Sequence, residues 1–155
     1  IDTFSDTDVE KSGYVNLEKV FEGFDMKKEM VEKLESELTQ KEEVLDSITF
    51  NLSILRSKAV APDATQQEMF AFQQMQNYFL EEKKKYEEFA AIQTQYYDGQ
   101  ILNQMSQYIK EYGEEQGFGF IYGALNSGNI LYGKESFDLT EQVIEAINEK
   151  YQGNI

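Results

Sequence analysis

Residues 31–55 read VEKLESELTQKEEVLDSITFNLSIL, and this stretch carries an apolar repeat seven residues long. One position of the repeat, counted from residue 24, is filled by Phe24, Val31, Leu38, Leu45 and Leu52, and the other by Leu34, Ile48 and Leu55. Apolar side chains spaced three and four residues apart lie on one face of an α-helix and form the seam of a coiled coil. The stretch therefore predicts a long helix that pairs with another helix.

A second run with the same period follows Pro62, the only proline of the chain. Its members are Met69, Phe72, Phe79, Tyr86, Ala90 and Tyr97. Counting outward from Pro62 places Leu52 level with Phe72 and Leu38 level with Tyr86. The two runs therefore predict one antiparallel coiled-coil hairpin over residues 24–99, with arms of about 54 Å at a helical rise of 1.5 Å per residue.

The tip of this hairpin is expected near residues 57–64. Pro62 disfavours helical backbone at the residue before it, and Thr65 with Glu68 forms a capping-box pattern for the returning helix. Arg56 and Lys58 are the basic residues of this region. We therefore expect the tip to be a small cationic spot on an acidic molecule.

The returning helix carries a second apolar stripe beside the seam. This stripe comprises Met75, Tyr78, Phe89, Ile92 and Tyr96, and Phe50 lies off the seam of the first helix. A two-helix hairpin has one partner face to cover, so we expect these residues either to contact another chain or to stay exposed for a ligand. The alternative is that the seam between the two helices is broad enough to include these residues.

Gly99 interrupts the helical pattern close to where the first arm begins on the other helix. Glycine weakens a helix interior by about 1 kcal/mol relative to alanine. We interpret Gly99 as a hinge, with close helix packing as the alternative. Beyond it, Leu102, Met105, Ile109 and Tyr112 form a stripe with no counterpart on the first arm, so this part of the helix is expected to pack on a base.

Both ends of the chain are expected to build that base, from residues 13–23 and 100–155. Residues 1–12 are acidic and lack a period, so they predict a loose start. Strands are expected at Gly13–Asn16, Phe118–Tyr122 and Ile130–Tyr132, and a C-terminal helix is expected to start at Asp138. The apolar residues assigned to this β body are Tyr14, Val15, Phe118, Phe120, Ile121 and Leu131. The fold class is α+β, and so small a sheet predicts oligomerisation, because its edges stay open.

The composition narrows the range of functions. Fourteen basic and 29 acidic residues give a net charge of -15, which argues against nucleic acid and anionic lipid as partners. Cysteine and histidine are absent, and no glycine-rich phosphate loop is present, so we expect no enzymatic activity and no cofactor. No apolar run is long enough to predict stable membrane insertion. The chain starts at Ile1, so we expect that a leader was removed. Whether the protein carries a lipid anchor is a question that the sequence leaves open.

Residues 8–19 have part of the pattern of a calcium-binding EF-hand loop, with oxygen ligands at loop positions one, three, five and nine and Gly13 at position six. Lys19 stands at position twelve, where a glutamate should close the site, and no helix is predicted to enter the loop. We therefore expect no metal site here and interpret the segment as an acidic lead into a strand.

The order of these segments resembles the Skp (OmpH) family of periplasmic chaperones. The similarity covers residues 13–151 and rests on GYVNLEKVF at 13–21, GFGFI at 117–121, NILY at 129–132 and DLTEQVI at 138–144. The resemblance implies a homotrimer with a central β-barrel body and three hairpins hanging as tentacles around a cavity. It also implies a periplasmic holdase that binds unfolded outer-membrane proteins in that cavity without ATP.

The charge departs from that family, whose best-known members are strongly basic. If the chain is a holdase, we expect its arms to contact clients through the second stripe and Phe50, with little help from charge. The alternative function is a structural spacer or adaptor whose coiled-coil arms bind one defined folded partner.

Overall fold

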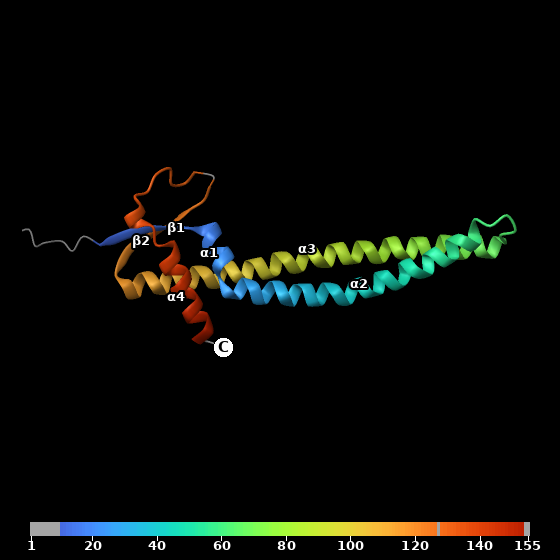
Figure 1. The fold of residues 1–155 in the computed structure, drawn as a ribbon, viewed down its shortest axis with the longest axis horizontal. Coiled ribbons are helices and arrows are strands. Elements are labelled where there is room, and N and C mark those ends of the chain that lie inside the picture. Colours follow the sequence, from blue (N-terminus) through green and yellow to red (C-terminus); the bar gives the residue numbers. More distant parts are fainter. Residues whose placement is uncertain (1–9, 127, 154–155) are drawn as a thin grey trace, which may run out of the picture. The chain divides into compact units, whose positions relative to one another are not determined.

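The computed structural model describes residues 10–126 and 128–153 and is mainly helical, with a small two-stranded sheet (Figure 1). Its elements are β1 (Lys11–Asn16), α1 (Leu17–Gly23), α2 (Asp25–Ala59), α3 (Gln66–Gln116), β2 (Phe118–Ala124), the 3-10 helix η1 (Glu135–Phe137) and α4 (Thr140–Gly153). The chain divides into two compact units. The hairpin unit is Met30–Tyr97, and the body unit holds the residues up to Glu29 and from Asp98 onward.

In the hairpin unit, α2 and α3 run side by side in opposite directions (Figure 1). The predicted capping box is confirmed: the Thr65 amide donates to Glu68 Oε2 at 2.9 Å, and the Glu68 amide donates to Thr65 Oγ1 at 3.2 Å. Both bonds satisfy polar groups at the start of α3 that the helix itself leaves without partners. The cap therefore defines where the chain turns back.

The predicted pairing of the two helices is close to the observed one, with an offset of about one helical turn at Tyr86. Leu52 and Phe72 line the same hollow. The Tyr86 hydroxyl, however, donates to Glu42 at 2.5 Å, about one helical turn from Leu38. Side chains tilt toward the N-terminus of their own helix, so Tyr86 leans toward the tip and Glu42 leans away from it. Level counting along the backbone neglects this tilt.

In the body unit, β1 and β2 pair in parallel, with Gly13 opposite Ile121 and Val15 opposite Gly123. The Leu139 amide donates to the Tyr14 carbonyl at 2.8 Å on the other edge of β1. The interior is made of Val15, Val20, Phe24, Ile101, Val143 and Ile147, all at most 1 % exposed. Residues from both ends of the chain therefore share one core.

Three expectations for the body need correction. Residues 130–132 form no strand; Leu131 is 93 % exposed, and no described segment of the chain offers this apolar run a partner strand. Helix α4 starts at Thr140 and not at Asp138. Asp138 lies one residue before the N-cap position, and its Oδ1 accepts a hydrogen bond from the Thr140 amide at 2.9 Å. Lys11 and Ser12, expected in the loose start, belong to β1, and residues 1–9 lie outside the described part. Of the EF-hand-like segment, residues 11–16 form this strand and residues 17–19 begin α1.

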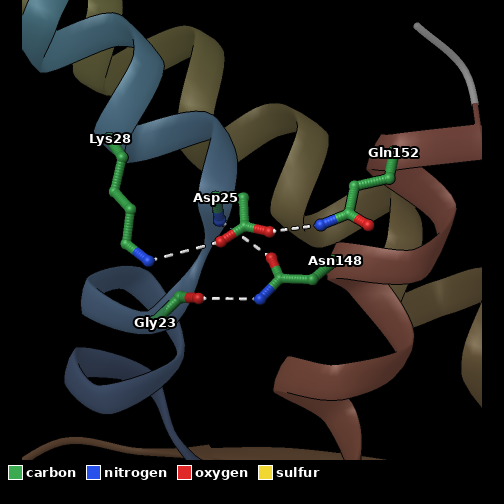
Figure 2. Close-up of polar contacts among 5 residues, drawn as sticks. All are labelled: Gly23, Asp25, Lys28, Asn148 and Gln152. Carbon is green, nitrogen blue, oxygen red and sulfur yellow. Dashed lines mark hydrogen bonds and ion pairs between the residues drawn. The ribbon is translucent and has the colours of Figure 1, made fainter.

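Asn148 of α4 bridges the break between α1 and α2 (Figure 2). Phe24 is extended there, with φ -79° and ψ 121°, so the helical hydrogen bonds are interrupted. The Asn148 side chain accepts from the Asp25 amide at 2.8 Å and donates to the Gly23 carbonyl at 2.9 Å. One amide group thus satisfies a donor and an acceptor at the corner, and it can do so because a carboxamide offers both.

Replacing Asn148 with alanine should destabilise the body unit. The Asp25 amide and the Gly23 carbonyl would lose their partners in a partly buried place, which costs about 1–3 kcal/mol of unfolding free energy. Urea unfolding followed by circular dichroism measures the change. Gln152→Ala is the control, because the Gln152 bond to Asp25 lies on the surface and should contribute less than about 0.5 kcal/mol. Equal losses in both variants would contradict the bridging role.

Tyr151 packs its ring against Phe24, at 5.6 Å between centroids, and donates its hydroxyl to Glu29 at 2.5 Å. Burial, followed by the hydrogen bond to the Glu29 carboxylate, raises the pKa of Tyr151 to about 12 from 10.0. The folded state thus keeps the phenolic proton to a higher pH than the unfolded state does. Stability linked to this group is complete below pH 10 and is lost as pH rises toward 12.

Tyr151→Phe should therefore make stability less dependent on pH in this alkaline window. The measurement compares urea midpoints at about pH 9 and about pH 11.5 for the wild type and the variant. Tyr132→Phe, which removes a tyrosine that is 84 % exposed, serves as control and should leave the decline as steep as in the wild type. An unchanged decline in Tyr151→Phe would show that other groups produce it.

Candidate functional site: the exposed apolar surface of the hairpin

The seam of the hairpin buries few side chains. Among residues 30–97 the buried apolar residues are Ile48, 6 % exposed, and Tyr97, 5 % exposed. Polar pairs supplement them: Glu37 accepts from the Tyr97 hydroxyl at 2.8 Å and from the Gln93 amide at 3.1 Å. Burial, together with the Glu37 bond, raises the pKa of Tyr97, so its hydroxyl stays a donor. Much of the apolar surface of the two helices is therefore left outside the seam.

The second stripe splits into two groups. Met75 and Phe89 are half-buried, and the ammonium of Lys41 lies 4.3 Å from the centre of the Phe89 ring. The contact gives Lys41, a cation at a seam position, a favourable partner. Tyr78, Ile92 and Tyr96 are 46 %, 65 % and 56 % exposed. Phe50 is 66 % exposed on α2, so the structure presents four of the six candidate residues to solvent.

The sequence interpretation missed other exposed apolar residues close to the tip. They are Ile54, Val60, Met69, Phe70 and Leu80, which are 41–71 % exposed. Met69 was assigned to the seam, whereas Phe70 and Leu80 belong to no repeat. A usable sign was present in the sequence, since all of these residues fall within residues 47–80, which hold four charged side chains in 34 residues.

The tip is less cationic than expected. Arg56 and Lys58 are exposed as predicted, but Asp63 and Glu68 lie in the same short region and cancel their formal charges. The Thr65 amide and hydroxyl, with a smaller contribution from Lys58, hold the pKa of Glu68 below its usual value. Glu68 therefore stays ionised, and the tip as a whole is neutral.

A hollow between α2 and α3 holds Lys41, Lys85, Glu82 and Phe89. Its cations already have partners: Lys85 binds Glu82 at 2.8 Å and Glu81, outside the hollow, at 3.2 Å, and Lys41 lies over the Phe89 ring. These contacts occupy the positive charges of the hollow. We therefore assign the binding surface to the exposed apolar side chains and not to this hollow.

Gly99 lies within α3, which continues through it without a break. A methyl group added at Gly99 would meet no atom within 4 Å, so close packing does not account for the glycine. Its role as a hinge stays a prediction.

The residues assigned to the β body lie in different surroundings. Val15 is 1 % exposed and belongs to the interior, while Tyr14, Phe118 and Ile121 are half-buried. Phe120 is 64 % exposed and stacks on Tyr122 at 5.6 Å between ring centroids, and Leu131 is almost fully exposed. In the two-stranded sheet, one edge of β2 lacks a partner strand within the described residues. Phe120 thus leaves an apolar surface on the strand with the open edge, and Leu131 adds an exposed apolar side chain in the loop that follows.

Comparison with known proteins places the chain in a family. Of the described residues, none forms a helix long and apolar enough to span a bilayer. No curated protein sequence matches the chain significantly. A crystal structure of a proposed outer membrane chaperone (OmpH-like) from Caulobacter crescentus CB15 is similar in fold, with a TM-score of 0.59 and 12 % identity over 97 % of this chain and 90 % of that one. The model of the outer membrane protein (OmpH-like) family matches residues 11–147, and the chain therefore belongs to this family.

Proposed function

We propose that this protein is a chaperone of the holdase type that binds unfolded outer-membrane proteins in the periplasm and prevents their aggregation without ATP. The observation that carries the proposal is the exposed apolar surface of the hairpin unit, formed by Phe50, Tyr78, Ile92 and Tyr96. Surfaces of this kind on a soluble protein mark binding sites. Membership of the OmpH-like family and the likeness to a proposed outer membrane chaperone support it.

The holdase role fits the hairpin because binding there needs no fixed partner geometry. Aromatic and aliphatic side chains on helix surfaces make contacts that tolerate many client sequences, and several weak contacts together give useful affinity. The hairpin of each copy would contribute one such surface. A client held between several hairpins would be kept apart from other unfolded chains.

We further propose a homotrimer in which the β bodies of three copies join as a central barrel around which the hairpins form a cavity. The open edge of β2 and the exposed Phe120, Tyr122 and Leu131 support this assembly. An open edge with apolar side chains is unfavourable in water and is covered when strands of neighbouring copies pair. Oligomerisation would also stabilise a body whose own sheet has two strands.

The holdase proposal predicts that the purified protein suppresses aggregation of an outer-membrane β-barrel protein diluted from urea. Turbidity should fall to near the background at about one trimer per client, and adding ATP should change nothing. A folded water-soluble protein is the control ligand and should not bind. Undiminished turbidity at that ratio would rule out the holdase role, and tight binding of one folded partner would favour an adaptor.

The assembly proposal predicts a trimer in sedimentation velocity experiments. Phe120→Lys should shift the protein toward monomer, because a charge would be buried in the contact between copies at a cost of several kcal/mol. Leu102→Lys is the control, since Leu102 is also exposed, at 47 %, but belongs to α3 and not to the sheet. A monomeric wild type, or a Phe120→Lys trimer of unchanged stability, would contradict this assembly.

A further inference from the structure

The hairpin unit has an end of low charge, residues 47–80, which includes the turn between α2 and α3. These 34 residues contain four charged side chains, Arg56, Lys58, Asp63 and Glu68, whose formal charges cancel. The remaining 34 residues of the unit, 30–46 and 81–97, carry ten acidic and five basic side chains. Charge is thus distributed very unevenly along two helices that are otherwise continuous.

The low-charge end also carries most of the exposed apolar side chains of the unit. Seven large apolar residues there are more than 40 % exposed, namely Phe50, Ile54, Val60, Met69, Phe70, Tyr78 and Leu80. Phe50 lies two residues from both Ile48 and Leu52, which face the seam, so its side chain lies off the seam. Side chains placed off the seam cannot be covered by the partner helix.

Uncharged hydrogen-bonding side chains lie between these apolar residues. Asn51, Gln66, Gln67, Gln73, Gln74, Gln76 and Asn77 are all exposed. Each carboxamide offers a carbonyl acceptor and an NH₂ donor without a charge. A surface that mixes apolar groups with such amides can cover the apolar side chains of an extended polypeptide and also satisfy the backbone N–H and C=O groups that lose contact with water.

We infer that the low-charge end, residues 47–80, is the principal contact surface for clients and that it selects unfolded segments of low charge that mix apolar with uncharged polar residues. This inference rests on the proposed holdase function and adds to it the place of binding and the chemistry of the bound segment. The acidic remainder of the hairpin unit repels anionic segments and keeps the loaded complex soluble.

Two other occupants fit the surface less well. A lipid bilayer offers no partners for the seven carboxamides below its headgroups, and a net charge of -15 disfavours approach to an anionic membrane. A second copy of this low-charge end is helical, so its backbone N–H and C=O groups already have partners and leave the carboxamides unused. An unfolded chain uses both the apolar and the amide groups, so we assign the surface to unfolded polypeptide.

The test measures binding of a fluorescent peptide with net charge zero, built of alternating Val or Leu and Ser or Asn, by fluorescence anisotropy on the full-length protein. Phe50→Gln combined with Phe70→Gln should raise its Kd about tenfold, because the substitutions remove two of the seven exposed apolar side chains, both aromatic, and a few large side chains carry most of the binding energy of an interface. The matched control is Val44→Gln combined with Leu102→Gln, which replaces one exposed apolar residue on each helix outside the low-charge end. This control should change Kd less than about twofold.

Salt and peptide charge provide a second readout. Kd for the neutral peptide should change less than about twofold between about 0.05 M and about 0.5 M NaCl, whereas a Glu-containing version should bind more weakly at low salt. Circular dichroism and sedimentation of each variant establish that fold and assembly are kept. The substitutions lie on exposed helix positions and use a good helix former, so they should fold.

The outcomes separate the two proposals. A wild type that binds no unfolded chain would refute the holdase function itself. If the wild type binds and the Phe50→Gln/Phe70→Gln variant binds equally well, only the inference about the low-charge end is overturned. The same holds if the control double variant binds as poorly as the Phe50→Gln/Phe70→Gln variant. Binding to phosphatidylcholine vesicles as strong as to the peptide, or self-association that these two substitutions abolish, would assign the surface to lipid or to a second copy and also overturn it.

Discussion

The parallel pairing of β1 with β2 is the constraint on which the rest of the body depends. Two parallel strands need a long crossover between them, and here α1, α2 and α3 together provide it. Because the two strands belong to opposite ends of the chain, Val20 and Phe24 pack with Ile101 and Ile147 in one interior. The Asn148 bridge at Gly23 and Asp25 then ties α4 to the point where α2 begins.

The hairpin unit follows a different physical rule. A pair of helices has a single contact face, so it buries little, and Tyr97 and Ile48 are its buried apolar side chains. Hydrogen bonds from Tyr86 to Glu42 and from Tyr97 to Glu37 fix the register where apolar packing is thin. The apolar surface that a chaperone would need is thus a direct consequence of building the unit from two helices.

Much of the fold could be predicted because it depends on local pattern. The seven-residue repeat predicted the two helices, Thr65 and Glu68 predicted the cap, a short β-prone run predicted β1, and alternation predicted β2. The parallel register and the role of Asn148 are long-range pairings, which no local pattern encodes. The strand expected at Ile130–Tyr132 failed for a related reason, since an apolar run becomes a strand only where another strand accepts its hydrogen bonds.

The candidate surface was predicted less completely because periodicity describes the angle of a side chain around a helix and not how much of it a partner covers. Met75 and Phe89 shared a stripe with Tyr78 and Ile92 by spacing, yet the first two are half-buried and the other two are exposed. Charge density along the chain is a useful second guide, since seven of the eleven exposed large apolar residues among residues 30–97 lie in the half where charges are scarce. A binding surface of this composition depends on contact area, and salt screening, which weakens attraction between charges, should leave it largely intact.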